Sequence, residues 1–123
     1  MSHINAKQSM QTLAHAAVGG DSSKSSGVGN AINAVVDPNG GAKVVCVKVH
    51  FNTAVTTSEE LTIHSEDLDE GSTHSFVYFT QNAQNLTDIV FTDPIFLHRT
   101  ERLVVSFANT DAVTWGLTVL YGE

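Results

Sequence analysis

The sequence predicts an all-β fold: an antiparallel two-sheet sandwich of jelly-roll or Greek-key type with about eight strands, preceded by a flexible N-terminal arm. From residue 31 onward, apolar and polar residues alternate with a period of two, and polar turn sequences separate the short apolar runs. No interior segment has a helical period. A chain of 123 residues, 41% of them hydrophobic, suits one such domain. We therefore assign residues 1–30 to the arm and linker, and 31–123 to a β-sandwich domain.

The N-terminal segment differs in composition from the rest of the chain. Residues 1–30 are rich in Ser, Gly, Ala and Asn and hold few large apolar side chains, too few to offset the entropy of ordering the segment alone. Residues 21–29 (DSSKSSGVG) have the composition of a flexible linker. The arm is either a disordered tail or a segment that orders against a neighbouring subunit. In the second case the candidate partner-binding residues are Ile4, Met10, Leu13 and Val18.

The first strands of the domain surround a strong turn signal. Residues 31–36 form a short strand, and 37–41 form a turn, because Pro38 fixes φ and the Asn-Gly pair after it supplies positive φ. Residues 42–51 are the clearest strand, with Lys48 and His50 on its polar face. Its core face is expected to consist of Val45, Val47, Val49 and Phe51.

Further strands follow to the end of the chain. We expect them over 60–65, 74–80, 88–91, 95–97, 103–108 and 113–121. Pro94 breaks the ladder between two of them. Two alternatives stay open for the core face of 74–80: Phe76 with Tyr78, or Val77 with Phe79. The last strand is nearly apolar, so we expect it to be central in its sheet, with Trp115 as the largest burial.

Composition excludes several classes of function. The net charge of −7 argues against a nucleic-acid groove and against binding to an anionic membrane. The single cysteine, Cys46, can form no intramolecular disulfide, and its apolar neighbours favour a small buried hydrophobe over a reactive thiol. We find no apolar stretch of membrane-spanning length and no signal-peptide core, which predicts synthesis and folding in a cytoplasm.

Chemistry-bearing residues are present without the motifs that make them sites. The six histidines include no H-x-H or H-x-x-x-H pair, although His50 and His64 could meet across a sheet. The acidic run 66–71 resembles a calcium loop only superficially, and an acidic hairpin loop is favoured. The sequence holds no nucleophile elbow, phosphate-binding loop or dinucleotide fingerprint. We therefore expect no enzyme activity, no catalytic residues, no cofactor and no metal.

Three segments carry a resemblance to a known group of proteins. They are 48–63 with the turn Thr-Thr-Ser-Glu, 87–91 followed by 95–97, and 103–111 with the turn Asn-Thr-Asp, followed by 115–119. In this fixed order they resemble small structural proteins encoded among the virion genes of tailed bacteriophages. Such proteins are β-sandwich decoration, cement or fibre-associated components. The resemblance implies no catalytic residues, and most of 1–46 lies outside it.

Composition and resemblance together predict a non-enzymatic phage virion structural protein, in the first place a capsid decoration or cement component. Its expected partners are copies of itself, as a homo-oligomer and possibly a trimer, and phage capsid or tail proteins, but no nucleic acid and no membrane. It is expected in the virion after synthesis in the host cytoplasm. One alternative is a receptor- or carbohydrate-binding sandwich at a phage tail or fibre, which exposed aromatics would favour; its candidates are Tyr78, Phe79 and Tyr121. Another is a small cupin-like metal enzyme, which needs converging histidines.

Overall fold

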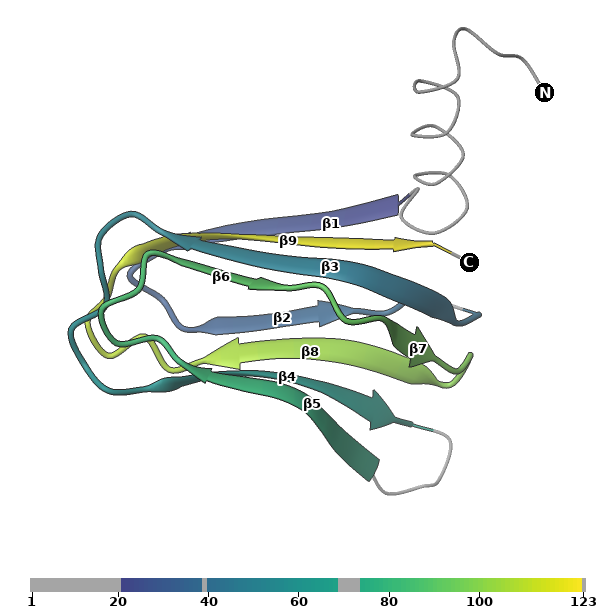
Figure 1. Cartoon of the computed structure of the whole chain (residues 1–123). Helices are drawn as coiled ribbons and strands as arrows, with labels where there is room; N and C mark the ends of the chain where they lie inside the picture. The colour runs from purple at the N-terminus through teal and green to yellow at the C-terminus, as the bar shows by residue number, and fades with distance from the viewer. Residues whose placement is uncertain (1–20, 39, 69–73, 123) are drawn as a thin grey trace, which may run out of the picture.

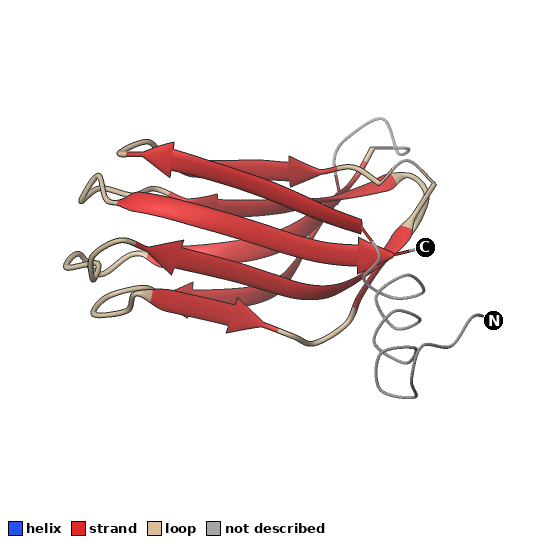
Figure 2. Cartoon of the chain, turned by 90° about the horizontal axis from the view of Figure 1, so that it is seen from above, coloured by secondary structure: helices blue, strands red, loops and turns tan. Residues whose placement is uncertain are grey.

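The computed structural model describes residues 21–38, 40–68 and 74–122, and these residues form nine strands and no helix. The strands are β1 (Asp21–Val28), β2 (Ile32–Val36), β3 (Ala42–Phe51), β4 (Glu60–Asp67), β5 (His74–Asn82), β6 (Asp88–Phe91), β7 (Ile95–Leu97), β8 (Glu101–Phe107) and β9 (Thr114–Gly122). Figure 1 shows two layers of strands, and Figure 2, seen from above, shows that the strands lie roughly along one axis. The predicted all-β sandwich of two antiparallel sheets is confirmed.

The order of the strands defines the topology. The first sheet has the order β1–β9–β3–β6, with β7 also pairing with β3, and the second sheet has the order β2–β8–β4–β5. The paired strands are β1 with β9, β2 with β8, β3 with β6 and β7, and β4 with β5. This pairing is that of one long antiparallel hairpin folded over into two sheets. This is the jelly roll, one of the two topologies that the sequence left open. Pro94 separates β6 from β7, which occupy one position of the roll.

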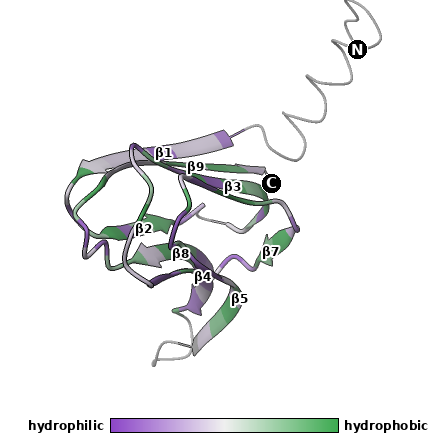
Figure 3. Ribbon diagram, turned by 60° about the vertical axis from the view of Figure 1, so that its left-hand side comes forward, coloured by the Kyte–Doolittle hydropathy of each residue, from purple (hydrophilic) through white to green (hydrophobic). Residues whose placement is uncertain are grey.

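Strand β1 corrects the sequence prediction for residues 21–29. The segment was expected to be a flexible linker, but its eight residues from Asp21 to Val28 pair with β9 without interruption. In Figure 1, β1 and β9 lie side by side although they begin and end the described chain. Figure 3 shows β1 pale over most of its length, because it consists mainly of small polar residues. The sandwich therefore includes residues 21–28, which the sequence analysis had assigned to the arm. The candidate partner-binding residues Ile4, Met10, Leu13 and Val18 lie outside the described residues.

A bulge in β3 changes which side chains enter the core. The register with β9 shifts between Val44 and Cys46, so an extra residue is inserted at Val45. As a result Val44 is buried, and Val45, which was expected in the core, is only half-buried. The other predicted core residues of this strand, Val47, Val49 and Phe51, are buried as expected. Cys46, expected to be a small buried hydrophobe, is half-buried and lies opposite Leu120.

A second bulge explains why neither alternative for 74–80 is correct. Ile63 pairs with Phe79 and His64 with Val77, which leaves Tyr78 as the extra residue on β5. Tyr78 and Phe79 therefore both pack partly against the core, although they are adjacent in sequence. Phe76 and Val77 are exposed, at 62% and 54%.

The core fills the space between the two sheets. It includes Phe51 and Phe107, whose rings lie 5.3 Å apart. Trp115 is buried, and its Nε1 donates to the carbonyl oxygen of Asn30 at 2.9 Å. Strand β9 lies between β1 and β3 in the first sheet. The expectations of a central last strand and a buried Trp115 are both confirmed.

Candidate functional site

The two turns that carry the resemblance meet at one end of the sandwich, on the left in Figure 1. The carboxylate of Asp111 accepts hydrogen bonds from the backbone N–H groups of Thr56 and Thr57 at 2.6 and 2.9 Å. It also accepts the hydroxyls of the same two threonines at 2.9 and 2.5 Å. These bonds, that of the Thr57 hydroxyl first, hold the pKa of Asp111 far below its usual range. A second carboxylate, that of Glu59 in the first turn, accepts hydrogen bonds from the second turn: from the backbone N–H of Thr110 at 2.9 Å and from the Thr110 hydroxyl.

Asn109 completes this turn from inside the protein. It is buried with φ at 57°, in the left-handed region that Asn tolerates better than most residues. Its Nδ2 donates to the carbonyl oxygens of Asn30 and Val113 at 2.8 and 2.9 Å, and its Oδ1 accepts the Val113 N–H at 3.1 Å. The polar groups of the two turns are thus engaged with each other and with the chain around them. The motifs that stand out in the sequence act here as a clamp between loops.

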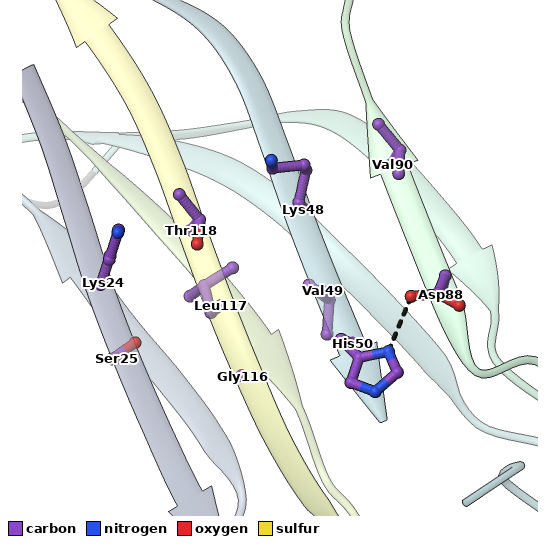
Figure 4. A pocket seen from close by; sticks show the side chains of 10 residues that line it. All are labelled: Lys24, Ser25, Lys48, Val49, His50, Asp88, Val90, Gly116, Leu117 and Thr118. Atoms are coloured by element: carbon purple, nitrogen blue, oxygen red, sulfur yellow. Dashed lines mark hydrogen bonds and ion pairs between the residues drawn. The ribbon is translucent and has the colours of Figure 1, made fainter. Parts of the chain in front are cut away.

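A groove lies on the outer face of the first sheet, and we call it the Gly116 groove. Its volume is about 410 Å³, and Figure 4 shows its lining: Lys24, Ser25, Lys48, Val49, His50, Asp88, Val90, Gly116, Leu117 and Thr118. Strand register arranges the outward residues in two rows that cross β1, β9, β3 and β6. One row is Lys24, Thr118, Lys48 and Val90. The other is Ser26, Gly116, His50 and Asp88, where Gly116 contributes no side chain.

Charge in the groove is arranged around Thr118. Lys24 and Lys48 are its direct neighbours on β1 and β3, which places their Cα atoms about 10 Å apart, two strand spacings. In the adjacent row, His50 Nδ1 lies 2.7 Å from Asp88 Oδ1, with both side chains more than half exposed. The hydrogen bond with His50 lowers the pKa of Asp88 from its usual value. The groove is thus lined by two lysines and by one carboxylate, which is bonded to His50.

The outer face of the second sheet has a different character. Val35, Val104, His64 and Val77 form one row across its four strands, which we call the valine row. Val35 and Val77 are exposed, whereas Val104 is buried. Beside this row, Arg102 Nη2 lies 2.8 Å from Glu66 Oε1, and the hydrogen bonds from Arg102 lower the pKa of Glu66. This face therefore combines a row of three valines and one histidine with an ion pair.

The structure does not bring together the histidines proposed as a metal pair. His50 lies on the outer face of the first sheet and His64 on that of the second. Among the described residues, no three His, Cys, Asp or Glu side chains are grouped so that they could hold a metal ion. Half of the acidic run 66–71, residues 69–71, lies outside the described residues. Within the described part of the chain, we find no helix that is long and apolar enough to cross a membrane.

The Gly116 groove was not predictable as a unit from the sequence. Lys48 and His50 were expected on the polar face of a strand, but Lys24 lay in the supposed linker and Gly116 carried no motif. The three aromatic residues considered as candidates for ligand binding, Tyr78, Phe79 and Tyr121, are partly buried against the core. The exposed aromatics are instead Phe76 on β5 and Phe96 on β7.

Comparison with known proteins shows only distant similarity. No protein-family model matches the chain, and no curated protein matches it. Two solved structures of chitosan-binding module 1, from a chitosanase/glucanase of Paenibacillus sp. IK-5, are each 15% identical. The first, a selenomethionine-labelled mutant, has a TM-score of 0.49 and covers 84% of this chain and 77% of that chain. The second has a TM-score of 0.48, with coverages of 83% and 94%. The structure of Tomato aspermy virus has a TM-score of 0.33 and 11% identity, with coverages of 84% and 77%. These similarities are distant and say nothing about a ligand or an activity of this chain.

Proposed function

We propose that the protein is a non-enzymatic structural component of a tailed-phage virion, which attaches to the capsid as a decoration or cement protein. One observation carries the proposal: the two turns on which the resemblance depends are hydrogen-bonded to each other through Asp111 and Glu59. Turns used in this way hold the loops of the sandwich together and take no part in catalysis or ligand binding under this proposal. An architectural role for these turns fits a structural protein.

The jelly roll supports the same proposal through the surfaces that it leaves open. The edges of the first sheet are formed by β1 and by β6 with β7, and those of the second by β2 and β5; edge strands need covering or pairing. Both sheets also turn an outer face to solvent, with different chemistry on each. We propose that the protein forms a homo-oligomer, with a trimer as the expected symmetry, and that the valine row lies between copies. Attachment to the particle is proposed to run through Ile4, Met10, Leu13 and Val18.

Sedimentation with phage particles that lack the protein tests this proposal. The full chain should sediment with such particles at micromolar concentration, in a stoichiometry set by the capsid lattice. A chain that begins at Asp21 keeps every described strand and removes the proposed attachment residues, so it should sediment much less. Equal sedimentation of both chains would show that the first 20 residues are not the attachment site. A full chain that ignores capsids and tails alike would contradict the virion assignment.

The alternative of a carbohydrate-binding module depends on exposed aromatics. Phe76 and Phe96 are exposed, but they lie on β5 of the second sheet and β7 of the first, so they form no common platform. Phe96 is also covered in part by Lys43, whose Nζ lies 5.4 Å from the ring centroid. Binding of neutral oligosaccharides by the full chain, lost when Phe96 is changed to Ala, would favour this alternative over the structural role.

A further inference from the structure

Gly116 lacks the reasons that explain Gly27, Gly29, Gly40 and Gly41. At Gly27 an added Cβ would lie 2.7 Å from Trp115 Nε1, and it would also collide with Asn30. Gly29, Gly40 and Gly41 have positive φ, which other residues rarely adopt. At Gly116, φ lies outside that region and an added Cβ would meet no atom within 4 Å.

A glycine within a strand weakens it, because it loses more conformational entropy on folding and packs no side chain. Gly116 lies in β9, between two neighbouring strands, where Thr or Val would suit the sheet better. A glycine in this situation often marks a place where a ligand or another backbone approaches closely. The bare backbone at Gly116 is the open floor of the groove in Figure 4.

The charge around this floor is opposite to that of the whole chain. The full sequence has a net charge of −7, yet all three lysines of the described residues, Lys24, Lys43 and Lys48, lie on the outer face of the first sheet. Two of them line the Gly116 groove, and its single carboxylate, Asp88, is paired with His50. A local positive face on an acidic protein attracts a negatively charged partner and directs its approach.

From these observations we propose that the Gly116 groove binds an extended acidic segment of a partner protein. Its carboxylates would pair with Lys24 and Lys48, while its backbone lies over Gly116 and Thr118. Side chains on one face of an extended segment are spaced by roughly 7 Å, which brings successive acidic residues within reach of both flexible ammonium groups. Val90, which is 56% exposed, offers an apolar contact at the β6 end of the groove.

Other anionic polymers fit the groove less well. None of its lining residues is Trp, Tyr or Phe, so it offers no flat ring against which a sugar or a base could stack. The site proposed here goes beyond the virion assignment, since it does not depend on the identity of the particle.

Fluorescence anisotropy with the full chain and a labelled oligoglutamate peptide tests the site. Gly116→Thr places a side chain on the floor of the groove and should weaken binding at least about tenfold. The same variant should melt at the same or a higher temperature than the wild type, because Thr suits a strand better than Gly. Lys24→Gln combined with Lys48→Gln should weaken binding about tenfold, and raising the salt concentration should weaken the wild type.

Lys43→Gln is the matched control for Lys48→Gln alone, because each removes one lysine charge from the same face of β3 and Lys43 lies outside the groove. It should change the affinity by less than about twofold. If Lys43→Gln and the substitution of a groove lysine weaken binding equally, the charge effect is not localised to the groove, and the proposal is overturned. Unchanged binding by Gly116→Thr would overturn it as well, and so would tighter binding of a sulfated oligosaccharide of equal charge. None of these results bears on sedimentation with particles, so a failed groove and a failed virion assignment are distinguishable.

Discussion

At the scale of single residues, the sandwich depends on polar side chains that connect its loops. Asp111 is the clearest case, because one carboxylate accepts two backbone and two side-chain hydrogen bonds from Thr56 and Thr57. Bonds from N–H and O–H donors favour the ionised form of the carboxyl group and depress its pKa. The loop between β3 and β4 is thereby attached to the loop between β8 and β9.

The Asp111 clamp should make the stability depend on acidic pH. A depressed folded pKa stabilises the native state above the unfolded pKa of about 3.9, and this contribution is lost as pH falls toward the folded pKa. Asp111→Asn should therefore lower the urea midpoint at pH 7, and the gap to the wild type should narrow below about pH 4. Asp93→Asn, the same change at an exposed turn, is the control and should shift the midpoint little. A constant gap from pH 7 to pH 2.5 would rule out the ionised carboxylate as the cause.

Trp115 has both a packing role and a polar one. It is 5% exposed in the core and donates to the Asn30 carbonyl, which also accepts from Asn109. Trp115→Ala should lower the free energy of unfolding by about 3–5 kcal/mol, as expected for a large buried ring. Trp115→Phe keeps most of the ring and loses the Nε1 donor, so a smaller loss that includes about 1 kcal/mol for the hydrogen bond is expected. Denaturant melts measure the free energy of unfolding of both variants. An equal decrease for Trp115→Phe and Trp115→Ala would mean that the hydrogen bond contributes more than the packing of the ring.

At the scale of elements, sequence patterns predicted the strands that have an apolar face and missed the one that does not. The strands from β2 to β9 each contain apolar residues facing the core, so their period of two was readable. Half of the residues of strand β1 are serine, and its pairing with β9 makes it a strand. The bulges at Val45 and Tyr78 were also invisible, because an inserted residue changes the pairing without changing the local composition.

The position of β1 predicts how truncation will affect the fold. A chain that begins at Ala31 loses all of β1 and also Asn30, whose carbonyl accepts the Trp115 hydrogen bond. It exposes the hydrogen-bonding edge of β9, so it should unfold at least about 2 kcal/mol more easily and tend to aggregate. A chain that begins at Asp21 keeps the edge covered and should unfold cooperatively at the midpoint of the full chain. Circular dichroism during urea titration distinguishes the three chains; equal midpoints would show that β1 contributes no stability.

At the scale of the whole molecule, rolling one long hairpin into two sheets creates two outer faces with different chemistry. The first carries the lysines and the Gly116 groove, and the second carries the valine row beside the Arg102–Glu66 ion pair. Neither face was predictable from the sequence, because each consists of residues from four strands that only register brings into one row. Lys24 and Lys48, for example, are separated by the whole of β2 along the chain but flank the same threonine in the sheet.

The last prediction concerns the second face and the proposed oligomer. Val35 and Val77 are exposed at opposite ends of the valine row, so replacing both with Glu should cost the monomer little stability. In the assembly the new charges would be buried against a neighbouring copy, at a cost of several kcal/mol for each unpaired ion. Light scattering should therefore show the homo-oligomer converted to a monomer by Val35→Glu with Val77→Glu. The control, Asn33→Glu with Thr80→Glu, places the same charges on the same two edge strands one row away. At equal concentration, it should leave a larger oligomeric fraction than the valine variant does. If both double variants assemble like the wild type, the valine row is not the interface between copies.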